Sequence, residues 1–96
     1  MKREYLVTTL AQDRVGLLSR VAMVFSRRGI NIERLTLAES AMKGIASISM
    51  VIHTDGRTAR QIVKQIEKQV EVLQAFAAER PGINQHMEKD LQMVTY

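Results

Sequence analysis

The order in which two hydrophobic periodicities follow one another is the feature that most restricts the fold of this chain. Apolar residues recur at helical spacing in residues 17–25 and again in residues 59–70. The segments before, between and after them alternate between apolar and polar side chains. A repeat near 3.6 residues buries one side of a helix, and a repeat of two buries one face of a strand. The pattern therefore predicts the order β-α-β-β-α-β.

Turn and capping residues set the boundaries of these elements. The segments predicted as strands are 5–10, 30–38, 45–53 and 71–78. In the second strand the alternation slips at Glu33-Arg34, which we interpret as a β-bulge. Asp13 is a candidate N-cap of the first helix, and Gly29 fits the position just past its end. Residues 58–61 fit a capping box for the second helix.

Two right-handed βαβ units around a hairpin give an α+β, ferredoxin-like βαββαβ sandwich, with both helices on one face of the sheet. The other face would be bare in a monomer. A chain of 96 residues buries only roughly two-thirds of its unfolded surface, so we expect dimerisation. We expect one domain over residues 1–79. Residues 80–96 are expected to form a C-terminal extension, a loop and then a short extra strand at residues 90–96.

Several functional classes lack the residues that they require. The sequence contains no cysteine, which excludes a disulfide framework and a thiol nucleophile. No apolar run approaches the ~18 residues of a membrane span, so a cytoplasmic protein is expected. The only histidines are His53 and His86, and no nucleophile elbow or glycine-rich nucleotide motif is present. We therefore expect no catalytic residue, no metal ligand and no bound cofactor.

Basic residues are in excess, with a net charge of +4. Some of them recur at three- and four-residue steps and share one face of the second helix: Arg57, Arg60, Lys64 and Lys68. This stripe is either a solvated helix face or a surface that docks on an acidic partner, and both interpretations stay open. Nucleic acid is disfavoured because aromatics make up only 4% of the chain and no helix-turn-helix pattern is present.

The junction between the first strand and the first helix, residues 13–18, has the strongest local signal. A glycine at the start of a helix allows a ligand to approach the backbone closely. Free amide groups and the positive end of the helix dipole attract a carboxylate there. A tight turn at Gly16, with Asp13 capping the helix, explains the same residues without a ligand.

The pattern D-x-x-G-x-L at residues 13–18, followed by F-S-x-R-G-x-N-I-E at 25–33, resembles an ACT domain, the small-molecule sensor of many amino-acid enzymes. The longer blocks at 16–21, 25–37 and 65–73 resemble the regulatory small subunit of acetolactate (acetohydroxyacid) synthase. The resemblance covers roughly residues 4–78, and residues 86–90 also resemble the segment that follows that domain.

The resemblance implies a homodimer in which two sheets join side by side and an effector amino acid binds between the subunits. One chain would supply the loop and helix start, and the other would supply the beginning of the strand after the helix. The effector-binding residues carried over in this way are Asp13, Gly16, Leu17, Leu18, Asn31 and Ile32.

In this family the small subunit activates the catalytic large subunit and confers feedback inhibition by branched-chain amino acids, chiefly valine. Thiamine diphosphate, magnesium and FAD are implied for the catalytic partner and not for this chain. Asp13 stands where valine-sensing members commonly carry Asn. An ACT module that activates its partner without sensing an amino acid is therefore the alternative, and a nucleic-acid-binding regulator is a third, less favoured one.

Overall fold

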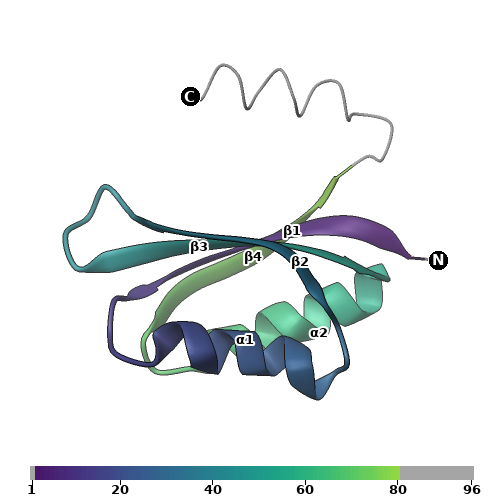
Figure 1. The fold of residues 1–96 in the computed structure, drawn as a ribbon, viewed down its shortest axis with the longest axis horizontal. Helices are drawn as coiled ribbons and strands as arrows, with labels where there is room; N and C mark the ends of the chain where they lie inside the picture. The colour runs from purple at the N-terminus through teal and green to yellow at the C-terminus, as the bar shows by residue number, and fades with distance from the viewer. Residues whose placement is uncertain (1, 81–96) are drawn as a thin grey trace.

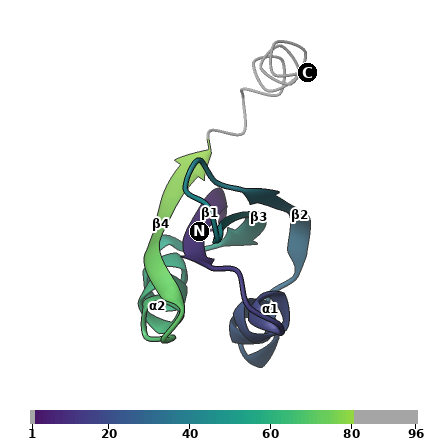
Figure 2. The same cartoon turned by 90° about the vertical axis from the view of Figure 1, so that its left-hand side faces the viewer.

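A four-stranded antiparallel sheet in the order β2-β3-β1-β4 carries two helices on one face (Figure 1, Figure 2). This computed structural model describes residues 2–80, so the expected extension and extra strand at 81–96 lie outside the described residues. The predicted fold and element order are confirmed. The elements are β1 Arg3–Gln12, α1 Leu17–Arg27, β2 Ile32–Glu39, β3 Ile45–Thr54, α2 Gly56–Glu67 and β4 Val72–Arg80.

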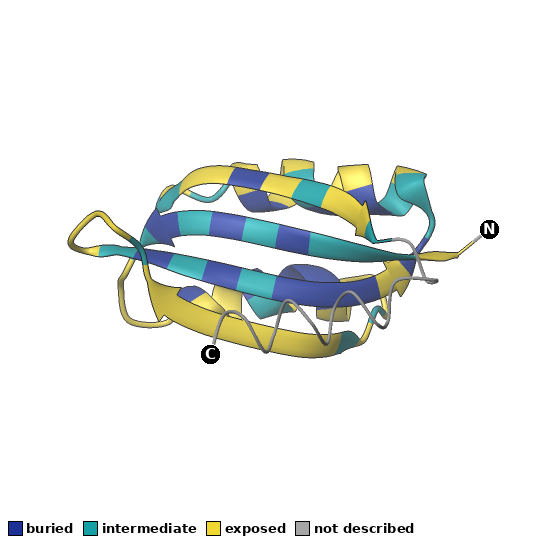
Figure 3. Ribbon diagram, turned by 90° about the horizontal axis from the view of Figure 1, so that it is seen from above, coloured by how far each residue is buried: buried dark blue, intermediate teal, exposed yellow. Residues whose placement is uncertain are grey.

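The hydrophobic core lies between the sheet and the helices. The two central strands, β1 and β3, bury Val7, Ile48 and Met50 completely beneath the helices. Phe25 of α1 and Ile62 of α2 are buried against them. The edge strands remain largely exposed, as Figure 3 shows. The core therefore depends on aliphatic side chains from the middle of the sheet.

The bulge predicted in β2 is confirmed as a register shift between Ile32 and Arg34. Ile32 pairs with Ile52, whereas Leu35 pairs with Met50 two residues along β3. Strict alternation would place Ile32 and Leu35 on opposite faces of the sheet. One extra residue in β2 returns Leu35 to the helix-facing side, so the hydrophobic pattern itself requires the bulge.

The C-terminus of α1 is confirmed, whereas both predicted N-caps are wrong. The N–H of Gly29 donates to the carbonyl of Ser26, and the N–H of Ile30 donates to that of Phe25, each at 3.0 Å. The N-cap of α1 is Gly16 instead of Asp13, and no side chain caps this end. The N-cap of α2 is Asp55, which lies three residues before the predicted Thr58.

Asp55 caps α2 because its carboxylate accepts the N–H of Thr58 at 3.1 Å. Thr58 therefore serves as the donor to the cap, and the helix starts at Gly56. Hydrogen bonds from Thr58, first from its side chain and then from its N–H, hold the pKa of Asp55 below its usual range.

Replacement of Asp55 should make the stability of the domain less dependent on pH in the acid range. Because the folded pKa is lowered, the cap stabilises the domain above the unfolded pKa of about 3.9 and loses this effect as pH falls through the folded value. Asp55→Ala should lower the thermal midpoint at pH 7, and this difference should shrink at acid pH. Asp55→Asn, which caps without titrating, is the matched control and should retain most of the midpoint at pH 7. An Asp55→Ala midpoint equal to that of the wild type at pH 7 would contradict the cap.

Candidate functional site

Hydrogen bonds to two neighbouring turns fix the loop between β1 and α1. The N–H of Gln12 donates to the carbonyl of Glu71 at 2.8 Å, and the N–H of Asp13 donates to that of Gly44 at 2.9 Å. The loop then closes a turn in which the N–H of Leu17 donates to Arg14 at 3.0 Å. The start of α1 is thus held against the turns that precede β3 and β4.

Gly16 adopts the left-handed conformation, with φ of +83°, at the N-cap of α1. L side chains rarely adopt this conformation. A Cβ at this position would also lie 2.9 Å from Nη1 of Arg20. The turn therefore requires glycine for its backbone angle and for the space that Arg20 occupies.

The first turn of α1 offers donors for an anion. Within residues 2–80, the N–H groups of Gly16, Leu18 and Ser19 have no acceptor, and the first turn has no acidic side chain. The positive end of the helix dipole adds to their attraction for a negative group. The N–H of Leu17 is already bonded to Arg14, and the Leu17 side chain is buried. Leu17 therefore contributes to the core beneath the loop.

The side chain of Arg20 holds this loop in place, a role that the sequence analysis did not predict. Its Nε bonds to the Glu71 carboxylate, and its Nη1 donates to the carbonyl of Val15 at 3.3 Å. A hydrogen bond from the Glu71 backbone, followed by the contact with Arg20, holds the pKa of Glu71 below its usual range. The contact with Glu71 could not be predicted, because Glu71 is distant in sequence. The position of Arg20 four residues after Gly16, one helical turn along, was the only local signal that its side chain could reach the loop.

The two groups of predicted effector-binding residues do not meet within one chain. Asn31 and Ile32 follow the C-terminus of α1, whereas Asp13, Gly16 and Leu18 precede or begin it. A helix of 11 residues separates them by roughly 16 Å. Asp13, Leu18 and Asn31 are exposed, and Ile32 is half-buried. A pocket that uses both groups therefore needs two copies of the chain.

The basic residues of α2 are solvent-exposed, as predicted for one stripe of this helix: Arg57, Arg60, Lys64 and Lys68. Lys68 also lines a groove of about 500 Å³ between the two helices, together with Arg27 and Arg28. Arg28 crosses this groove, since its Nη1 donates to Oε1 of Gln61 at 2.9 Å. Neither described helix is long and apolar enough to cross a membrane.

Residues 7–74 match the family of AHAS (acetohydroxyacid synthase) small-subunit-like ACT domains. The chain belongs to this family. It is 39% identical over 69 residues to the probable acetolactate synthase small subunit of Methanothermobacter thermautotrophicus, covering 72% of this chain and 41% of that protein. It is 35% identical over 74 residues to the acetolactate synthase small subunit of Bacillus subtilis, covering 76% of this chain and 42% of that protein.

The solved structures agree with this family. The acetolactate synthase small subunit of Thermotoga maritima superposes with a TM-score of 0.72 at 37% identity, over 78% of this chain and 47% of that chain. The ACT domain of a GTP pyrophosphokinase from Chlorobium tepidum shares only the fold, with a TM-score of 0.69 at 16% identity, over 81% of this chain and all of that one. The chain thus spans less than half the length of the curated relatives reported above.

Gly16→Ala should destabilise the domain more than Gly44→Ala. Both positions have positive φ, and the left-handed conformation costs an L residue roughly 1–2 kcal/mol. At Gly16 the new methyl would also displace Arg20 from Val15, whereas nothing lies within 4 Å of a Cβ at Gly44. The free energies of unfolding in urea give the comparison. A Gly16→Ala variant as stable as the wild type would contradict this turn.

Proposed function

We propose that this chain is a non-catalytic regulatory subunit of acetolactate synthase. In this role it activates the catalytic large subunit and confers feedback inhibition by a branched-chain amino acid, foremost valine. The observation that carries the proposal is the uncapped start of α1, with the free N–H groups of Gly16, Leu18 and Ser19, in a domain of this family. Thiamine diphosphate, magnesium and FAD would be held by the catalytic partner.

The effector would bind by its two charged ends and its branched side chain. The free amides of Gly16 and Leu18 suit the carboxylate. The exposed carboxylate of Asp13 suits the ammonium group. Asn31 of a second copy offers both a donor and an acceptor, and Ile32 of that copy offers an aliphatic surface. Because α1 separates these groups within one chain, the site would form only at the dimer interface.

The β2 edge is the surface that suits this dimer. Leu35 and Leu37 lie on its helix-facing side, yet they are 39% and 51% exposed. Leu18 and Met23 of α1 are 37% and 48% exposed. A free edge strand with exposed leucines is a template for pairing with another strand. A second copy at this edge would extend the sheet and cover these side chains.

The regulatory mechanism would be thermodynamic linkage. An effector that bridges two subunits binds one arrangement of the pair more tightly and raises its population. The catalytic subunit would contact the same pair, so its activity would follow that arrangement.

Branched-chain amino acids should therefore raise the thermal midpoint of the chain. At millimolar concentration we expect valine, leucine or isoleucine to increase it, because a ligand that binds only the folded state stabilises that state. Gly16→Asp should abolish the increase, since a carboxylate would then occupy the anion position. Gly44→Asp, also at positive φ but on another turn, should retain it. No shift with any of the twenty amino acids would remove the sensing claim.

Charge at the β2 edge should dissociate the dimer. Leu37→Lys should give a monomer in analytical ultracentrifugation at concentrations where the wild type is dimeric, because it places a cation against the partner strand. Leu73→Lys on the opposite edge strand is the matched control, since Leu73 is 55% exposed. Dissociation by Leu73→Lys alone would place the interface at β4 instead.

Activation without sensing is the second candidate function, and the exposed carboxylate of Asp13 beside the amide donors favours it. The basic stripe Arg57, Arg60, Lys64 and Lys68 would then dock on an acidic surface of the catalytic subunit. In the first proposal the same stripe could dock on the catalytic subunit while a separate surface binds the effector.

A further inference from the structure

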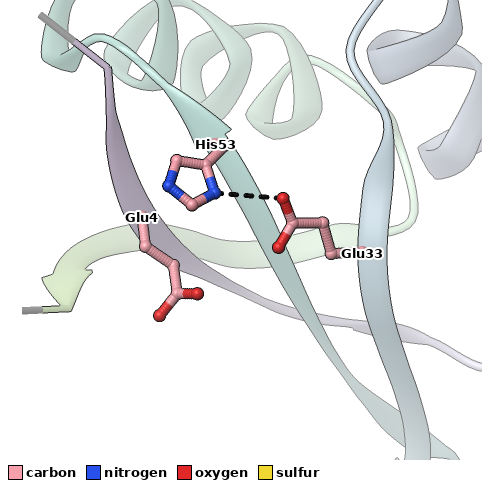
Figure 4. Close-up of side chains that lie close together, drawn as sticks. All are labelled: Glu4, Glu33 and His53. Carbon is pink, nitrogen blue, oxygen red and sulfur yellow. Dashed lines mark hydrogen bonds and ion pairs between the residues drawn. The ribbon is translucent and has the colours of Figure 1, made fainter. Parts of the chain in front are cut away.

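Three potential metal ligands from three neighbouring strands meet on the face of the sheet opposite the helices. They are Glu4 of β1, Glu33 of β2 and His53 of β3 (Figure 4). One ligand atom of each lies within 4.8 Å of the other two. Nδ1 of His53 and Oε2 of Glu33 are 3.0 Å apart. No local motif predicts this cluster, because 48 residues lie between Glu4 and His53 in the sequence.

The register of the sheet creates this cluster. Glu4 pairs directly with His53, so both side chains leave the same face. Glu33 is the extra residue of the bulge in β2, because Ile32 pairs with Ile52 and Arg34 pairs with Val51. Ile52 is the neighbour of His53 in β3. Bulges commonly redirect a side chain. Here the bulge that keeps Leu35 on the helix-facing side also presents Glu33 to His53.

One imidazole nitrogen and two carboxylate oxygens form a ligand set that suits a divalent transition metal. Zinc sites with open positions commonly use three such protein ligands at about 2.0–2.2 Å, which places ligand atoms roughly 3.4 Å apart. Small side-chain rotations would close the remaining gap. Such rotations are available because the side chains of Glu33 and His53 are 44% and 53% exposed. An imidazole ligand disfavours magnesium and calcium.

We propose that Glu4, Glu33 and His53 bind one divalent first-row transition metal ion, represented by Zn²⁺, with water in the open positions. Arg80 supports this arrangement, because its Nε lies 3.4 Å from Oε2 of Glu4 and orients that carboxylate. The ion would tie β1, β2 and β3 together at the bulge, next to Asn31 and Ile32. The site does not depend on amino-acid sensing, so either proposal can fail while the other stands.

Titration of the full chain with Zn²⁺ against a fluorescent chelator tests the proposal. We expect one ion per chain, and Co²⁺ should give the d–d absorption of a site with protein ligands. Loss of an outer-shell partner alone weakens metal binding on the order of 10–100-fold, so loss of a ligand in His53→Gln, Glu33→Gln or Glu4→Gln should weaken it at least as much. The matched controls His86→Gln, at the only other histidine, and Glu39→Gln, at another acid of β2, should bind as the wild type does.

Zn²⁺ should also raise the thermal midpoint of the wild type and leave that of His53→Gln unchanged. Without metal the two proteins should have the same circular dichroism spectrum, because His53 is exposed. If His53→Gln alters folding, the effect of Zn²⁺ on the thermal midpoint is compared between the wild type and Glu33→Gln instead. No binding by the wild type, unchanged binding by the His53 and Glu33 variants, or loss of binding in His86→Gln would each overturn the proposal.

Discussion

The structure depends on burying a single face of the sheet beneath two helices. This constraint explains why the central strands bury Val7, Ile48 and Met50 and why β2 needs an extra residue to keep Leu35 on the helix-facing side. The same bulge turns Glu33 outward beside His53, so core packing and the proposed metal site have one origin. Because β2 is an edge strand, a single copy leaves its leucines partly exposed.

The start of α1 has no capping side chain. Helices commonly begin with a side chain that accepts one of the first N–H groups, but Gly16 provides none and holds the left-handed conformation instead. Arg20 secures the turn through Val15 and Glu71, so the free donors do not depend on a flexible loop. A helix start with free N–H groups, held in place by Arg20, suits the carboxylate of the effector in the proposed function.

Much of the fold could be predicted because local patterns encode it. The element order, the bulge at Glu33-Arg34 and the helix end at Gly29 all follow from periodicity or turn chemistry. The N-caps were predicted wrongly because backbone geometry decides where each helix begins. The first helix begins after the left-handed Gly16, which has no capping side chain, and Asp55 instead of Thr58 caps the second. The support from Arg20 to Glu71 and the pairing of Glu4 with His53 depend on strand register, which no local pattern states.

The decisive measurement is the activity of the catalytic large subunit with and without this chain, across valine concentrations. We expect the chain to raise acetolactate formation and valine then to lower it, whereas the catalytic subunit alone should respond little to valine. Activation that valine leaves unchanged would contradict the sensing role and leave an interaction module. No effect of the chain on the rate would contradict the regulatory role itself.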